Sequence, residues 1–223
     1  MTTFMIIRKN LLQPAAILFF LLCLSGCASF KGNNLATIQS LESTNSGTSG
    51  VDSTFEFKGV QDYASRGDMP EISRSLLKDE FVKVLNQSGS FARLAPGQGG
   101  SMHLDVTIVN SASPVGLLPA ILTGLSLYLI PSWATDNYEA TVVVSGENIE
   151  QREYKFKDDV TLVQWLPMIF VGPFTGVFSV AADVRLNMWK HLVQEMREDG
   201  LIPTQKQASK QQIPVLSLST AHP

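Results

Sequence analysis

The sequence predicts an α+β domain: an antiparallel sheet with two main helices on one face, plus two short hydrophobic segments that contact a membrane or a partner. Several short stretches alternate apolar and polar residues, which is the period of strands with one buried face. Two longer stretches repeat their apolar residues with helical spacing. The two hydrophobic segments contain no charged residue, and prolines interrupt both of them.

A basic leader and an apolar run open the chain. Arg8 and Lys9 precede the run AAILFFLLCLSG. Its roughly dozen residues suit a signal peptide and fall short of the ~20 that cross a bilayer. Residues 1–26 are therefore expected to be a cleaved signal peptide.

The residues LSGC, which end at Cys27, resemble the lipobox of bacterial lipoproteins. The resemblance implies cleavage before Cys27, a diacylglyceryl thioether on its sulfur and acylation of the new N-terminus, with palmitate as a typical chain. Cys23, the only other cysteine, lies in the expected leader, so no disulfide is expected. In lipoproteins an Asp after the cysteine favours the inner membrane, whereas this chain has Ala28. We therefore expect an anchor in the outer membrane, with the domain facing the periplasm.

The α+β domain is expected over residues 54–202. Residues 27–53 are rich in Ser, Thr, Asn and Gly and predict a lipidated N-terminus with a flexible tether. The stretch TFEFKGV alternates and predicts a strand. Met69-Pro70 opens a helix that Gly89 ends.

Strands and a second helix follow. SFARLAP and SMHLDVTIV predict strands, and Tyr138–Ser145 with Arg152–Lys157 predicts a hairpin. The final helix shows the clearest apolar stripe and ends at Gly200. The residues of this apolar stripe are Ala182, Leu186, Trp189, Val193 and Met196. Residues 203–223 lack a sustained pattern and are expected to be disordered.

The hydrophobic segments cover about 114–133 and 160–174. Pro119 and Pro131 leave about a dozen helical residues in the first, roughly 18 Å of helix against a ~30 Å hydrocarbon core. Pro167 and Pro173 interrupt the second. Neither segment is expected to span a membrane.

Two interpretations of these segments remain open. They pack inside the domain or in an interface of a homo-oligomer or envelope complex, or they dip into the lipid leaflet beside the acyl chains. Three aromatic residues near the segment ends suit a membrane interface. The candidate membrane or partner contacts are Leu117, Leu118, Ile121, Leu125, Tyr128, Trp133, Trp165, Ile169 and Phe170.

No pattern in the sequence indicates catalysis. The net charge of −3 offers no basic face for nucleic acid. No metal-ligand spacing, phosphate loop or nucleophile motif occurs, so we assign no catalytic residue, metal or cofactor. His103 and Asp105 share a strand face, but such spacing is common among solvated residues. We therefore expect that the protein is not an enzyme.

Three stretches of the mature chain are similar to a group of uncharacterised bacterial lipoproteins: LYLIPSWATDNYEATVVV, WLPMIFVGPF and RLNMWKHLVQEMREDGLI. The β-α-β-β start also resembles, in architecture only, envelope lipoproteins of the curli-secretion type and auxiliary lipoproteins of transport complexes. The group brings no known activity, and a likeness of architecture does not transmit function. Our first hypothesis is a non-enzymatic structural or accessory component of the envelope whose apolar segments contact membrane or partner subunits. The alternative is a periplasmic carrier of lipid or another hydrophobic ligand, with the two segments lining a cleft.

Overall fold

A computed structural model describes residues 27–41, 50–113, 116–176 and 179–203. The expected signal peptide and all but the first residue of the expected tail lie outside these ranges. The strands are β1 (Cys27–Lys31), β2 (Val51–Asp62), β3 (Arg66–Asp68), β4 (Phe91–Pro96), β5 (Met102–Ala112), β6 (Ser132–Gly146) and β7 (Ile149–Gln164). The helices are α2 (Glu71–Ser88), α3 (Leu117–Leu125), the 3-10 helix η2 (Leu166–Ile169), α4 (Gly172–Thr175) and α5 (Ser179–Glu198).

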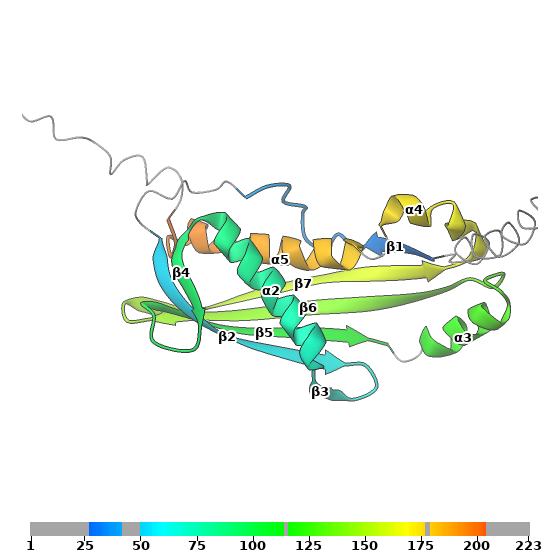
Figure 1. Cartoon of the computed structure of the whole chain (residues 1–223), viewed down its shortest axis with the longest axis horizontal. Helices are drawn as coiled ribbons and strands as arrows, with labels where there is room; N and C mark the ends of the chain where they lie inside the picture. Colours follow the sequence, from blue (N-terminus) through cyan, green and yellow to red (C-terminus); the bar gives the residue numbers. More distant parts are fainter. Residues whose placement is uncertain (1–26, 42–49, 114–115, 177–178, 204–223) are drawn as a thin grey trace, which may run out of the picture.

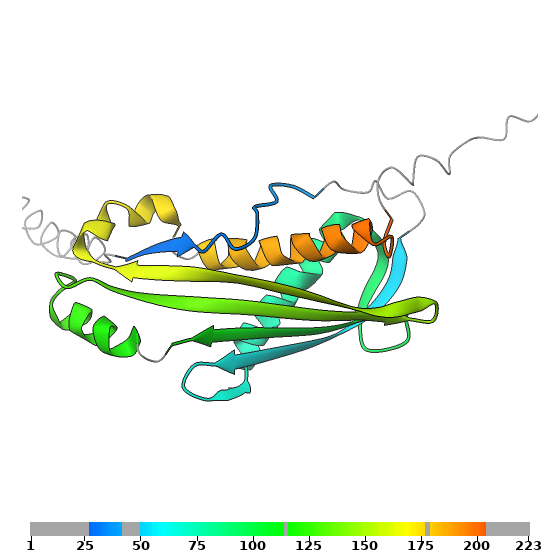
Figure 2. The same ribbon diagram turned by 180° about the vertical axis from the view of Figure 1, so that it is seen from behind.

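One seven-stranded sheet forms the body of the molecule, in the order β1-β7-β6-β5-β2-β3, with β4 also paired to β2. Helices α2 and α5 cover one face of this elongated sheet (Figures 1 and 2), which confirms the α+β class. The sheet is mixed, however, and not antiparallel throughout as predicted. Strand β2 runs parallel to β4 and β5, because α2 carries the chain back to the end of the sheet where β2 began.

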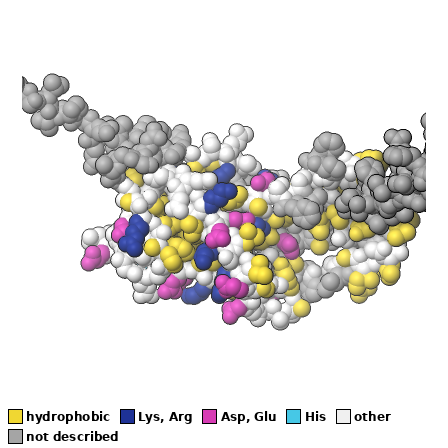
Figure 3. All heavy atoms as spheres, in the orientation of Figure 1, with side chains coloured by type: hydrophobic (Ala, Val, Ile, Leu, Met, Phe, Trp, Pro, Cys, Tyr) yellow, Lys and Arg dark blue, Asp and Glu magenta, His cyan; other side chains and the backbone are white. Residues whose placement is uncertain are grey.

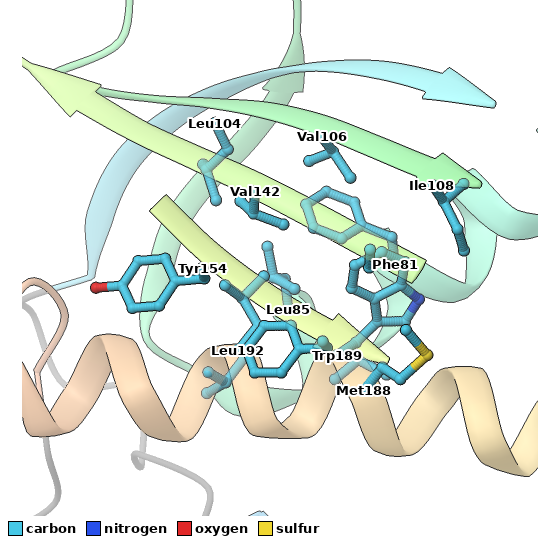
Figure 4. Packing of buried hydrophobic residues seen from close by; sticks show 14 of the residues in the cluster. Phe81, Leu85, Leu104, Val106, Ile108, Val142, Tyr154, Met188, Trp189 and Leu192 are labelled. Atoms are coloured by element: carbon cyan, nitrogen blue, oxygen red, sulfur yellow. The ribbon is translucent and has the colours of Figure 1, made fainter. Parts of the chain in front are cut away.

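The core lies between the sheet and the two long helices. In β5, the alternate residues Met102, Leu104, Val106 and Ile108 are fully buried, as their spacing predicts. Trp189 of α5 is also fully buried and meets the Phe81 ring of α2 edge-on at 5.2 Å between centroids (Figure 4). Burying such large rings supplies much of the free energy of folding.

A buried ion pair joins the two helices above the sheet. The Arg185 guanidinium on α5 donates two hydrogen bonds of 2.8 Å to the Glu80 carboxylate on α2. A third guanidinium N–H donates to the Tyr138 hydroxyl of β6 at 3.3 Å. Each charge of this network has a partner, so no charge is left unpaired in the core. The geometry of the hydrogen bonds also specifies how α2 and α5 cross.

The N-terminal segment is not the flexible tether that composition predicted. Residues 27–31 form β1, which pairs antiparallel with the end of β7. Gly32 and Asn34 hydrogen-bond to Asp158 and Asp159 of β7, and residues 36–39 then lie along α5. The Asn187 side chain accepts from the Ile38 N–H at 2.8 Å and donates to the Ala36 carbonyl at 3.0 Å. Composition missed this segment because its partners, the backbone of β7 and side chains of α5, lie more than a hundred residues away in the sequence.

Replacing Asn187 by Ala tests whether this segment is fastened to α5. Both hydrogen bonds are lost at a buried site, so we expect the free energy of unfolding to fall by about 1–3 kcal/mol. Hydrogen exchange of the Ile38 amide should accelerate in parallel. Gln194→Ala, which removes a solvent-exposed amide on the same helix, is the matched control. Unchanged exchange at Ile38 in Asn187→Ala would contradict a fastened segment.

Candidate functional site at the apolar end of the sheet

The two charge-free segments meet at one end of the sheet. Ser132, the first residue of β6, lies opposite Gln164, the last of β7. Gln164 also lies opposite Cys27, the first residue of β1. Helix α3 precedes β6 and lies beside its first residues, and η2 follows β7 and lies beside β1, so both helices are at this end of the sheet (Figures 1 and 2). We call this part of the molecule, residues 27–30, 116–135 and 160–176, the apolar end.

Large hydrophobic side chains are exposed chiefly at the apolar end. Of the fourteen such side chains exposed among the described residues, ten belong to the two segments. In Figure 3, charged side chains lie among hydrophobic ones over the left and middle of the view, whereas the part of the right-hand end that is not grey shows hydrophobic side chains without charged ones. The ten are Leu118, Ile121, Leu122, Leu125, Leu127, Leu129, Ile130, Trp133, Trp165 and Phe170.

Helix α3 is amphipathic in the reverse of the usual sense. Leu118, Ile121, Leu122 and Leu125 follow the spacing of one helix face, and all four are exposed. The buried position is Thr123, whose hydroxyl donates to the Pro119 carbonyl at 2.9 Å. In a helix that packs on a core in water, the apolar face is the buried one. In α3 the large apolar side chains face outward instead.

The turn after α3 satisfies its polar groups within itself. The Ser126 hydroxyl donates to the Thr123 carbonyl and accepts from the Ile130 N–H, both at 3.0 Å. The Leu166 N–H of η2 donates to the Tyr128 carbonyl at 2.7 Å, which ties the two segments together. Polar groups turned inward in this way leave apolar atoms facing outward.

Two residues of this turn adopt a strained backbone. Leu127 and Tyr128 have φ angles of 52° and 63°, in the left-handed region that favours glycine. Each such residue costs about 1 kcal/mol or more and persists only where its surroundings impose the conformation. The chain bears this cost in a turn that keeps the Leu127 side chain exposed.

Most of the predicted contact residues lie on the outside of the apolar end. Tyr128 and Ile169 are only half-buried, and the side chain of Leu117 lies outside the described part of the structure. Trp133 is in β6, and Val160–Gln164 extend β7, so the hairpin reaches further into both segments than predicted. The prediction missed Leu122, although helical spacing from Leu118 points to it. The others missed were Leu127, Leu129 and Ile130.

Cys27 sits half-buried at the edge of this site. Burial raises the pKa of its thiol, so the unmodified sulfur would be protonated near neutral pH. A thiol of this kind is a poor nucleophile and a poor metal ligand. In the described ranges, no three His, Cys, Asp or Glu side chains gather to hold a metal ion. His103 does not pair with Asp105; its Nδ1 lies 3.1 Å from the Thr54 hydroxyl.

Three surface hollows lie elsewhere among the described residues. The largest, of about 400 Å³, lies between α2 and β2 and is lined by charged residues such as Lys58 and Arg74 as well as by Phe57. The others, of about 200 and 160 Å³, adjoin α5 and the Tyr138 hydroxyl. None of these three is lined by the two segments, so they give the carrier hypothesis no support. No described helix has both the length and the apolar content needed to cross a membrane.

Comparisons with known proteins add little to this picture. Neither a protein-family model nor a curated protein matches the sequence. Protein XCC0632 from Xanthomonas campestris, assigned to the family DUF330, overlays with a TM-score of 0.33 and 8% identity over 71% of this chain and 96% of its own. A PelC dodecamer structure from Paraburkholderia phytofirmans overlays with a TM-score of 0.22 and 7% identity over 72% of this chain and 97% of its own. Both are bacterial proteins, and at these scores neither likeness carries a functional argument.

Ser126→Ala tests whether the turn depends on its internal hydrogen bonds. The substitution removes the hydroxyl that serves both the Thr123 carbonyl and the Ile130 N–H. We expect a loss of about 1 kcal/mol in the free energy of unfolding and faster hydrogen exchange over residues 126–130. Ser73→Ala, at an exposed serine in the first turn of α2, should change neither measurement. Slow exchange retained in Ser126→Ala would contradict this assignment.

Proposed function

We propose that this protein is a lipid-anchored, non-enzymatic accessory component of the bacterial outer membrane that faces the periplasm. One observation carries the proposal. Cys27, the residue that the lipobox resemblance marks for acylation, begins the edge strand at the apolar end. Acyl chains on its sulfur would thus emerge from the same end of the molecule that exposes ten large hydrophobic side chains.

The internal contacts of the domain favour a structural role over catalysis. The buried charged network of Arg185, Glu80 and Tyr138 joins α2 and α5 to the sheet. A second network joins the Arg152 and Tyr154 side chains of β7 to Asp199, at 2.7 and 2.6 Å. These contacts explain the shifted pKa of Tyr154, which burial raises most, followed by its hydrogen bond to Asp199. In both networks the charged and polar groups are paired with one another, including Tyr138 and Arg185, which line the smallest of the three hollows.

Metabolic labelling tests the anchor. Cells grown with an alkyne-tagged palmitate should yield labelled wild-type protein in the outer-membrane fraction. Cys27→Ser should abolish the label, because the expected mature chain has no other cysteine to form the thioether. Cys23→Ser, which alters the only other cysteine, should be labelled like the wild type. An unlabelled wild-type protein, or a label that follows Cys23, would contradict the proposal.

A further inference from the structure

We propose that the apolar end itself inserts into the lipid leaflet that holds Cys27, as a second anchor made of protein. The occupant of this surface is therefore lipid acyl chains rather than another protein. The inference rests on the proposed function, which supplies the membrane. It adds a contact that acylation alone does not require, because acyl chains could hold the domain clear of the surface.

A line of charges across the sheet marks where insertion stops. Lys31 of β1 and Asp136 of β6 both lie opposite Val160 of β7, and they are the first charged residues of their strands counted from the apolar end. Asp159 follows next along β7. Asp183, the first charge of α5, lies 3.5 Å from the Lys31 ammonium. Four elements thus begin to carry charge at one level.

The depth of the charge-free part fits one leaflet. From the row of Cys27, Gln164 and Ser132 to the level of Lys31 is four residues, or about 13 Å of strand. Helix α3 has nine residues, about 13 Å of helix. Half of a ~30 Å hydrocarbon core is about 15 Å. The apolar end is therefore of a size to enter a leaflet and too short to cross the bilayer.

Several polar groups within this part are paired with one another, which lowers the cost of moving them into lipid. The Thr135 and Thr161 hydroxyls lie 2.9 Å apart, and the Ser132 hydroxyl donates to the Gln164 side chain at 3.4 Å. The turn after α3 pairs its own groups through Ser126. A protein partner offers hydrogen bonds at its rim, whereas hydrocarbon offers none. The inward pairing therefore favours lipid over a second copy of the chain.

Two tryptophans are placed to report insertion, and a third is a built-in reference. Trp133 is 67% exposed and Trp165 is 39% exposed, both at the apolar end. Trp189 is 0% exposed in the core. These are the three tryptophans of the chain. Fluorescence from the first two alone should respond to lipid.

The experiment uses acylated full-length mature protein reconstituted into phosphatidylcholine vesicles, with or without bromine on the acyl chains. Bromine quenches tryptophans in contact with it, so wild-type emission should fall in brominated vesicles. The double variant Trp133→Phe/Trp165→Phe keeps only Trp189, and its emission should stay unchanged. Equal emission of the wild type in both kinds of vesicle, with the protein bound, would overturn the inference. Crosslinks between copies in that case would show that a second copy covers the apolar end.

A charge placed on the apolar end should reverse insertion. Leu125→Asp puts a carboxylate at a side chain that is 77% exposed on α3 and should lower partition of this end into the leaflet about tenfold or more, restoring emission in brominated vesicles. Ile72→Asp, at a helix position 87% exposed on α2, is the matched control and should leave quenching as in the wild type. Equal quenching in both variants would also overturn the inference.

Mass spectrometry of the same samples separates this inference from the proposed function. An unmodified Cys27 would refute the proposed anchor, whereas quenching that persists in vesicle-bound protein would still uphold insertion. An acylated Cys27 without quenching would uphold the anchor and refute insertion. The state of Cys27 therefore decides the proposed anchor, and quenching decides insertion, independently of each other.

Discussion

The pairing of β1 with the end of β7 fixes the position of Cys27 relative to everything else in the molecule. The five residues of β1 pair with Val160–Gln164, and residues 36–39 are hydrogen-bonded to side chains of α5. A flexible chain over residues 27–53 would let the domain wander about 30 Å from its anchor. With β1 in the sheet, that freedom is gone, and any group on Cys27 stays at the apolar end.

Because β1 is fixed in the sheet, the outward-facing apolar side chains of α3 lie at the same end of the molecule as any acyl chain on Cys27. Exposed leucines on a freely diffusing domain would invite aggregation. The same leucines, at the end of the molecule that would carry an acylated Cys27, would meet hydrocarbon at once, and insertion would release them from water at about 25 cal/mol per Å². The strained turn at Leu127 and Tyr128 is consistent with this, since it keeps Leu127 on the outside at the expense of backbone conformation.

Periodicity predicted the elements that face the core, because burial imposes its period on the sequence. The sequence predicted the alternating burial of β5 in this way. It also predicted the end of α2 at Ser88, which precedes Gly89 with φ 68°. Strand β1 was not, since CASFK is short and its partner lies more than a hundred residues away. The parallel pairing of β2 with β5 was missed for another reason: alternation shows that a strand is half-buried but not in which direction it runs.

The apolar end could be predicted in part. The sequence shows where charge is absent, so six of the nine predicted contact residues are exposed at this end. It could not show that the charge-free stretches of β1, β6 and β7 end at one level, because that depends on strand register. Nor could it show that Thr123 faces inward and the leucines outward, which is the observation that separates this helix from a core helix.

The height of the β6–β7 turn above the membrane tests most directly whether the domain stands on its apolar end. The β6–β7 turn lies at the opposite end of the long axis from the apolar end (Figure 1), about 35 Å of strand beyond the level of Lys31. If Cys27 is acylated, Asn148→Cys adds the only free thiol of the mature chain, so a dye there reports one position. Energy transfer to lipid-headgroup acceptors should place the dye about 35 Å above the membrane, at a narrow range of heights. A dye close to the surface, or spread over all heights, would contradict a domain that stands upright on its apolar end.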